Sequence, residues 1–315
     1  MSTRELDAAG ITDPGLRASY EYCRRLNAAH GKTYYLATLL LPRPKRPYVH
    51  ALYGFARYAD EIVDDLASTL TAAQKADQLK QWGGRFLRGE ADDATLPAVH
   101  DTIRRWNLPR EHFQAFLDSM RMDLSVAEYA TFDDLMGYVY GSAAVIGLQM
   151  VPILEPLSEA AYPYARDLGV GFQLANFLRD VGEDLRRGRI YLPMDSLALF
   201  GVTREHLEQG VVDAPVRRLL AYEIARTREI LRAAEPGVRL LHPTSQDCIV
   251  TALRLYGGIL DAVEEADYQV LDRRVRVGPL TRARVAVPAL RRARVARRRL
   301  PAVGGPTTPT SSASG

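Results

Sequence analysis

Two pairs of aspartates stand in stretches of sequence that are otherwise rich in apolar residues. Asp60 and Asp64 form the first pair, and Asp180 and Asp184 form the second. Side chains four residues apart lie on the same face of an α-helix, so each pair would place two carboxylates side by side. Like charges at this spacing weaken a helix, and unpartnered buried carboxylates cost far more free energy. One such pair is common on a solvated helix face, whereas two pairs among apolar residues indicate a bound cation.

Further polar side chains share these two faces. At 100° per residue, the members of the first face fall within about 60° and those of the second within about 80°. The first face carries Tyr53, Arg57, Asp60 and Asp64, and the second carries Gln173, Asn176, Asp180 and Asp184. Since the residues between the members of the second face are mostly apolar, this pattern predicts a polar stripe on a largely buried helix.

Magnesium suits this arrangement because it takes oxygen ligands and usually keeps water or substrate phosphate in its coordination shell. The sequence therefore predicts a Mg²⁺ site, with Mn²⁺ as an alternative ion. The predicted ligands are Asp60, Asp64, Asn176, Asp180 and Asp184. Such ions would clamp a diphosphate, and Arg57 and Arg179 could add charge-assisted hydrogen bonds to its oxygens. Departure of the diphosphate would leave an allylic carbocation.

A carbocation needs a site that excludes water and offers electron-rich aromatic faces. Candidates on or near the predicted helices are Tyr34, Tyr53, Tyr138 and Tyr256. Each of these tyrosines could equally be a core residue, and that alternative stays open. Small residues recur at helical spacing between Gly137 and Gly147. They would either let two helices approach closely or leave room for a long polyprenyl chain.

Helical periodicity recurs along nearly the whole chain, and the alternating pattern of strands is almost absent. We therefore predict an all-α fold with an N-terminal extension (1–11), one helical domain (12–275) and an arginine-rich tail (276–315). The predicted helices span residues 16–29, 48–66, 71–87, 96–106, 110–122, 132–152, 159–185, 214–234 and 245–270. In the tail, Pro288 is expected to interrupt the chain, and residues 304–315 are expected to be disordered.

One stretch, residues 135–154, carries no charged side chain and is nearly long enough to span a membrane. It also contains tyrosines, a glutamine, a proline and three glycines, so a buried core helix is the better interpretation.

The charge of the chain is distributed unevenly. Residues 273–315 contain eleven arginines and no acidic residue, whereas the rest of the chain has 30 basic and 38 acidic residues. A basic tail can meet anionic lipid, nucleic acid or only solvent. Because this tail has no aromatic residue on which a base could stack, no nucleic-acid partner is expected.

Several classes of site are excluded by what the sequence contains. The two cysteines, Cys23 and Cys248, are far apart, which excludes a disulfide scaffold and a thiolate zinc site and suits a reducing cytosol. The first ten residues lack the apolar core of a signal peptide. No glycine-rich GxGxxG segment follows a predicted strand, so no Rossmann site for NADPH is expected.

Two long segments resemble the aspartate-rich motifs of squalene and phytoene synthases. Segment 53–65 reads Tyr-Gly-Phe-Ala-Arg-Tyr-Ala-Asp-Glu-Ile-Val-Asp-Asp, which is similar to the first motif. Segment 173–193 runs from Gln-Leu-Ala-Asn-Phe-Leu-Arg-Asp to Gly-Arg-Ile-Tyr-Leu-Pro and resembles the second, more specific motif. The resemblance covers about residues 18 to 278, nearly all of the predicted domain.

Shorter segments match the same family in order. His30-Gly-Lys-Thr-Tyr34 is similar to a His-Ser-Lys-Ser-Phe segment, although Gly31 stands where a serine is common. Segment 138–147 resembles the family's helix of tyrosine, glycine and small residues. By this resemblance, Tyr53 and Tyr138 join the four aspartates as catalytic residues. The implied substrate-binding residues are His30, Thr33, Tyr34, Arg57, Gln173, Asn176, Arg179, Arg189, Tyr191, Tyr256 and Arg274.

The resemblance implies an isoprenoid synthase helical fold with a central active-site cavity. It also implies that two prenyl diphosphates are joined head to head through a cyclopropylcarbinyl diphosphate. The second motif is most similar to members that make phytoene from two geranylgeranyl diphosphates, via prephytoene diphosphate and without NADPH. The alternative is a member that makes squalene or presqualene diphosphate from farnesyl diphosphate.

The location expected from these features is the cytoplasm. The arginine-rich tail, next to an enzyme with a very apolar product, suggests peripheral contact with the inner face of the cell membrane. A solvated extension is the alternative.

Overall fold

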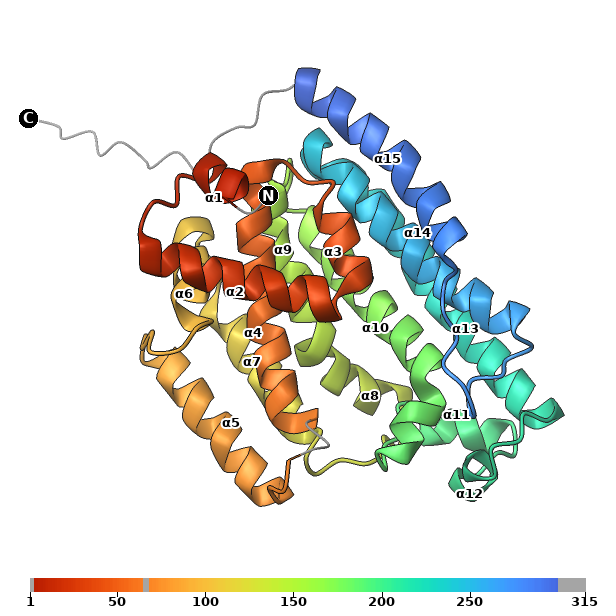
Figure 1. Cartoon of the computed structure of the whole chain (residues 1–315). Coiled ribbons are helices and arrows are strands. Elements are labelled where there is room, and N and C mark those ends of the chain that lie inside the picture. The colour runs from red at the N-terminus through yellow and green to blue at the C-terminus, as the bar shows by residue number, and fades with distance from the viewer. Residues whose placement is uncertain (1–2, 65–67, 300–315) are drawn as a thin grey trace, which may run out of the picture.

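The structure of the chain is a computed structural model that describes residues 3–64 and 68–299 (Figure 1). Helices dominate these two ranges, and no β-strand occurs in them beyond one isolated bridge between Pro156 and Leu241. The predicted all-α fold is therefore confirmed. The first part of the chain forms α1 (Thr3–Ala8), α2 (Pro14–His30), α3 (Lys32–Thr38), η1 (Arg43–Lys45), α4 (Arg46–Asp64), α5 (Ala72–Leu87), α6 (Leu96–Trp106), α7 (Arg110–Met122), α8 (Phe132–Val139), η2 (Tyr140–Ala144) and α9 (Val145–Leu154). The second part forms α10 (Ala161–Arg186), α11 (Met194–Leu199), α12 (Arg204–Glu208), α13 (Ala214–Ala234), η3 (Glu235–Leu240), α14 (Pro243–Glu265) and α15 (Pro279–Arg299).

The long helices were predicted well, and α6, α7 and α13 agree with the sequence prediction at both ends. The predicted end of α4 at Leu66 lies outside the described residues. The prediction for α14 was too long because Asp267 and Tyr268 adopt left-handed backbone conformations, with φ of 53° and 60°. Such residues cannot continue a right-handed helix.

Two helices near the site were not predicted. Helix α3 follows α2 after the single residue Gly31 and has too few residues to show a clear period. Helix α15 runs through Pro288, so the expected interruption there was wrong. It lies beside α14 (Figure 1), and its Ala289 and Ala293 are fully buried in the main core. The tail segment predicted to be disordered, 304–315, lies outside the described residues.

The apolar run with the length of a membrane span corresponds to Phe132–Leu154, which comprises α8, the π-helical turn η2 and α9. By length and composition it is the one such run in the described residues. It packs against α7 and α10, and more than half of its most apolar window is buried inside the fold. It therefore lies in the structure as the core helix that the sequence predicts.

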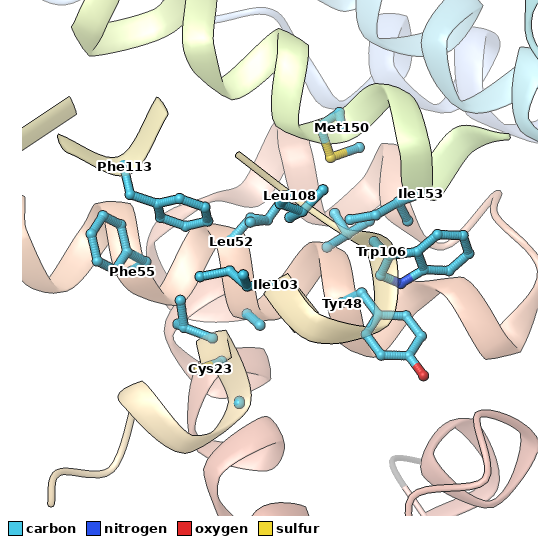
Figure 2. Packing of buried hydrophobic residues seen from close by; sticks show 14 of the residues in the cluster. Cys23, Tyr48, Leu52, Phe55, Ile103, Trp106, Leu108, Phe113, Met150 and Ile153 are labelled. Atoms are coloured by element: carbon cyan, nitrogen blue, oxygen red, sulfur yellow. The ribbon is translucent and has the colours of Figure 1, made fainter. Parts of the chain in front are cut away.

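Separate cores hold the two helices that carry the aspartate pairs. Helix α4 buries Phe55 in a cluster with residues of α2, α6, α7 and α9, and the Phe55 ring meets the edge of Phe113 at 5.0 Å between centroids (Figure 2). Helix α10 buries Leu178 and Val181 in a second cluster with α13 and α14. Each acidic helix is thus fixed on its apolar side by a packed core, which leaves its polar face to line a pocket.

Candidate active site

Two adjoining pockets lie between the N-terminal and C-terminal parts of the fold. The first is a cavity of about 690 Å³ with a largely apolar wall from α3, α4, α9, α10 and α14. The second, of about 750 Å³, has a charged wall from the ends of α4 and α10. His30, Tyr53 and Arg274 line both, so the charged pocket opens onto the apolar cavity. A charged head group and a long apolar chain could therefore occupy neighbouring spaces.

The charged pocket gathers both aspartate pairs. Asp60 and Asp64 come from the last turns of α4, and Asp180 and Asp184 come from the last turns of α10. The sequence predicted that the two pairs share one site, and in the structure all four aspartates line the same pocket. Two glutamates that were not among the predicted site residues, Glu61 and Glu183, line the same pocket.

Arginines neutralise three of the four aspartates. Arg57 Nη1 donates to Asp60 at 2.6 Å. Asp64 accepts from Arg187 at 2.6 Å and from Arg189 at 2.9 Å, which ties the end of α4 to the segment after α10.

Asp180 is held by two further arginines. Arg179 donates to its two oxygens at 2.7 and 2.6 Å, and Arg274 Nε approaches Oδ1 at 2.7 Å. Within the described residues, Asp184 has no such arginine within 4 Å. The pocket therefore offers both carboxylates and arginine side chains to an incoming phosphate.

Two of the aspartates have strongly raised pKa values. Burial, followed by the charge of Asp180, raises the pKa of Asp184 to about 8. Burial and the charge of Asp64 raise the pKa of Asp60 to about 6. Both shifts show that negative charge is unfavourable here without a further cation.

The donor set suits a hard cation that is shared with a substrate. All the acidic side chains of the pocket supply oxygen, which is the ligand atom that Mg²⁺ prefers. Within residues 3–64 and 68–299, no group of three or more His, Cys, Asp or Glu side chains is arranged to hold an ion alone. This does not conflict with a Mg²⁺ site, since Mg²⁺ commonly binds one or two carboxylates and completes its shell with water and phosphate oxygens.

The apolar cavity carries most of the predicted substrate-binding residues. Its wall includes His30, Thr33, Tyr34, Tyr53, Gln173, Asn176, Arg179, Tyr256 and Arg274. Tyr34 and Tyr53 lie with ring centroids 5.9 Å apart, and Tyr256 stacks on Phe172 at 4.2 Å. All of these aromatic residues line the apolar cavity, where they could face a carbocation, and Tyr53 lines the charged pocket as well.

The departure from the family pattern at Gly31 has a local explanation. A methyl group at Gly31 would lie 2.6 Å from a ring carbon of Tyr53, which is far inside van der Waals contact. A serine cannot be accommodated in this arrangement unless Tyr53 moves. The glycine thus permits α2 and α3 to meet directly beside the tyrosine that lines both pockets.

Three predicted site residues do not line either pocket. Tyr138 and Tyr191 instead donate hydrogen bonds to the two oxygens of Asp123, at 2.9 and 2.7 Å. Arg189 reaches the charged pocket only through its bond to Asp64. Burial raises the pKa of Asp123 to about 6, against the opposing charge of Arg189. This partly buried cluster is linked to Asp64 through Arg189, and its two tyrosines do not line the pockets.

The fold also brings to the pockets four basic residues that were not predicted from the sequence. Arg187 lines the charged pocket, and Lys32, Arg276 and Arg282 line the apolar cavity. Arg187 lies three residues after Asp184 and so could have been selected from its helical spacing. The other three come from a short helix and from the tail, whose placement no periodic pattern indicates.

Known proteins similar to this chain belong to the family that its sequence motifs resemble. The family model described as Squalene/phytoene synthase matches residues 27–281. The phytoene synthase of Arthrospira platensis is 38% identical over 293 residues, which covers 88% of this chain and 94% of that protein. The 15-cis-phytoene synthase of Synechococcus elongatus is 36% identical over 274 residues, a match that covers 83% of this chain and 89% of that protein.

A solved structure supports the same assignment of fold. A dehydrosqualene synthase crystallised with a ligand is 25% identical to this chain and superposes with a TM-score of 0.77. The match covers 90% of this chain and 98% of that one. The isoprenoid synthase fold with a central cavity, expected from the sequence, is thereby confirmed.

Proposed function

The chain belongs to the squalene/phytoene synthase family, and we propose that within this family it is a phytoene synthase. As a member of the family it is an enzyme, a prenyltransferase. The observation that carries the finer assignment is the identity of 36–38% to phytoene synthases over more than four fifths of the chain. The proposed substrate is geranylgeranyl diphosphate, and the proposed location is the cytoplasm.

The proposed reaction has two stages in one cavity. In the first, one diphosphate leaves with its bonding electrons, and the resulting allylic cation attacks the double bond of the second substrate. Loss of a proton closes a cyclopropane and gives prephytoene diphosphate. In the second, the remaining diphosphate leaves, the cation rearranges, and loss of another proton gives phytoene. No reductant is consumed, so NADPH is not required.

The charged pocket would receive the departing diphosphate. Asp60, Asp64, Asp180 and Asp184, with Asn176, would hold Mg²⁺, which when bound supplies positive charge to the leaving group. Arg57, Arg179 and Arg274 already lie on the pocket walls and can turn from carboxylate to phosphate oxygens. The reacting bond would thereby lie at the junction of the two pockets, beside Tyr53.

The apolar cavity would protect the carbocation from water. Tyr34, Tyr53 and Tyr256 line this cavity together with many aliphatic residues, and their rings would offer electron-rich faces to the cation. Burial raises the pKa of Tyr53, so this tyrosine stays neutral and does not act as a charged base at physiological pH. Its proposed role is to shape and shield the reacting centre.

The outward face of α15 is the proposed membrane contact. Leu280, Val287 and Val295 are 75%, 51% and 46% exposed and lie within about 100° of one another around the helix. The same face carries the exposed arginines Arg284, Arg291, Arg294 and Arg298. None of these arginines has a carboxylate within 4 Å in the described part of the chain. Arginines interleaved with exposed apolar side chains suit the interface of an anionic leaflet.

A product assay tests the proposed function. The purified full-length chain with Mg²⁺ would receive geranylgeranyl or farnesyl diphosphate, each with and without NADPH. We expect a C40 hydrocarbon with triene absorption from geranylgeranyl diphosphate, formed equally without NADPH. Squalene formed only with NADPH, or presqualene diphosphate formed from farnesyl diphosphate, would instead identify a squalene-type enzyme. Absence of any product would contradict the proposal.

A further inference from the structure

Asp123 caps the C-terminal end of α7 and lines neither of the two pockets. Its two carboxylate oxygens accept hydrogen bonds from Tyr191 at 2.7 Å and from Tyr138 at 2.9 Å. The rings of these tyrosines stack at 5.4 Å between centroids, and Tyr191 also stacks on Phe177 of α10 at 4.2 Å. Asp123 therefore joins the end of α7 to α8 and to the segment that follows the second acidic helix.

Arg189 connects this cluster with the first acidic helix. Its guanidinium group donates to Asp64 at 2.9 Å, and its side chain is only 14% exposed. Burial opposes the charged form of Arg189, but the acidic groups of Tyr191, Asp123 and Asp64 raise its pKa above the usual value. Among the described residues, Asp64 is the one carboxylate within 4 Å of Arg189. Asp123 thus acts on Arg189 through its charge and not through a direct hydrogen bond.

Two other arginines of the charged pocket each hold two carboxylates at once. Arg57 donates to its aspartate partner and also to Glu61 at 3.0 Å. Arg187 does the same with its own aspartate and with Glu183 at 3.0 Å. A cation that takes the aspartates would therefore leave both arginines with an acidic partner. Arg189 needs such a partner too, because a buried charge without compensation is strongly destabilising.

We propose that Asp123 is a positioning residue for the Mg²⁺ site and that it acts through Arg189. When a divalent cation binds Asp64, Arg189 must give up that carboxylate, and the charge of Asp123 then compensates it. The two tyrosine hydrogen bonds favour the charged form of Asp123 and hold it in place. Without that charge, Arg189 would compete with the cation for Asp64. This inference rests on the proposed function, because it assumes a divalent cation at Asp64.

Mn²⁺ titration tests the role of Asp123 without any turnover, since free Mn²⁺ is measured directly by its electron paramagnetic resonance signal. The full-length chain without substrate would be compared as wild type, Asp123→Asn, Arg189→Gln and the double variant. Asp118→Asn is the matched control, because Asp118 also lies on α7 and pairs with an arginine but lines neither pocket. Tyr191→Phe is a second control, which removes one hydrogen bond to Asp123 and keeps its charge. Thermal unfolding would verify that each variant is folded.

We expect Asp123→Asn to bind Mn²⁺ about tenfold more weakly, and each control to change the affinity by less than about threefold. Arg189→Gln should bind Mn²⁺ at least as tightly as the wild type, because it removes the competitor for Asp64. The double variant should behave like Arg189→Gln, since the effect of Asp123 requires the arginine. In turnover assays of Asp123→Asn, the Mg²⁺ concentration for half-maximal rate should rise, with little change in kcat at saturating Mg²⁺.

A merely structural role of Asp123 would weaken Mn²⁺ binding equally with and without the arginine. The proposal would therefore be overturned by an equal loss of affinity in the Arg189→Gln background, or by an unchanged affinity in Asp123→Asn. Absence of Mn²⁺ binding by the wild type would overturn it as well. Weaker binding by Arg189→Gln alone would also contradict it, which keeps the test decisive if Asp123→Asn does not fold.

The positioning role and the proposed function fail in different ways. If the wild type makes no C40 product while Asp123→Asn loses Mn²⁺ affinity only in the presence of Arg189, the positioning role stands and the proposed function fails. If the C40 product forms and the variants bind Mn²⁺ like the wild type, the proposed function stands and the positioning role is wrong.

Discussion

At the scale of single residues, the site is a balance of carboxylates and arginines. Asp60, Asp64 and Asp180 each have at least one arginine partner, whereas Asp184 has none within 4 Å in the described residues. This difference agrees with the larger rise of the pKa of Asp184, to about 8, than of Asp60, to about 6. Of these two aspartates, ionised Asp184 is therefore the one that destabilises the metal-free fold more.

We predict that Asp184→Asn stabilises the metal-free protein at alkaline pH. The folded-state pKa of Asp184 is raised above the ordinary value of 3.8 to about 8, so the folded chain binds the proton more tightly than the unfolded chain. Its contribution to stability is therefore greatest at low pH and is lost as the pH rises from about 4 through about 8. Asparagine cannot ionise and avoids this loss.

Thermal unfolding in EDTA at pH 6 and pH 9 measures this effect. The melting temperature of Asp184→Asn should exceed that of the wild type by a few degrees more at pH 9 than at pH 6. A constant difference between the two proteins across this range would contradict the assignment of the shift to Asp184.

At this scale the sequence predicted the carboxylates but not their partners. Helical spacing was sufficient to place Asp60 and Asp64 on one face, because that relation is local. The bonds from Arg187 and Arg189 to Asp64 join residues more than 120 positions apart, which no local pattern encodes. Tyr138 also showed this limit, because a tyrosine on an apolar helix can point either to a cavity or, as here, to a partly buried aspartate.

At the scale of elements, the second acidic helix is positioned by small residues. A methyl group at Gly147 of α9 would lie 2.1 Å from the carbonyl oxygen of Ala165 of α10, and one at Gly169 of α10 would lie 2.5 Å from the carbonyl oxygen of Ala143. The two helices therefore approach to backbone contact. Gly147 and Ala143 also line the apolar cavity. The sequence left open whether these small residues let two helices approach or leave room for a polyprenyl chain, and in the structure they lie where both are possible.

We predict that Gly147→Ala destabilises the fold and lowers activity. The new methyl group would push α10 away from α9 and shift Asp180 and Asp184, at a cost of about 1–3 kcal/mol in the free energy of unfolding. Gly257→Ala is the matched control, because Gly257 lies within α14 and the added carbon would meet no atom within 4 Å beyond the neighbouring backbone of its own helix. This control should stabilise the protein by about 0.5–1 kcal/mol.

Denaturant unfolding of both variants measures the difference. Equal effects of the two substitutions would show that the contact between α9 and α10 is not the reason for glycine at position 147.

The elements themselves were largely predictable, since long amphipathic helices have a strong period. Helix α3 was not, because it has only seven residues and follows α2 after one glycine.

At the scale of the whole molecule, the tail has two faces with different tasks. Arg282 on the inner face of α15 lines the cavity, and Ala289 and Ala293 are buried in the main core. The opposite face is exposed and carries arginines among apolar residues. Deletion of residues 279–315 would therefore disturb the cavity together with any membrane contact, so point substitutions are the sharper test.

We predict that Arg291→Gln combined with Arg298→Gln weakens binding to anionic vesicles about tenfold or more, at about 1 kcal/mol for each arginine near the surface. Co-sedimentation with vesicles that contain phosphatidylserine measures the loss, and neutral vesicles provide the baseline. The control is Arg88→Gln with Arg104→Gln, two exposed arginines of the body. Unchanged vesicle binding by the tail variant would end the membrane proposal.

The whole-molecule arrangement was the least predictable. Composition separated a basic tail from an acidic body, because net charge is a sum over residues. It could not indicate that the tail packs as a helix and supplies Arg282 to the cavity, since that depends on the packing of α15 against α14.

The central claim is that the two acidic helices form one diphosphate site for catalysis. The most direct measurement compares C40 hydrocarbon formation from geranylgeranyl diphosphate by the wild type, Asp60→Asn and Asp180→Asn, with Mg²⁺ present and folding verified by melting temperature. We predict that each substitution, on either helix, lowers turnover at least about a hundredfold while the protein stays folded. Near-normal turnover by either folded variant would contradict the claim that both helices act on the departing diphosphate.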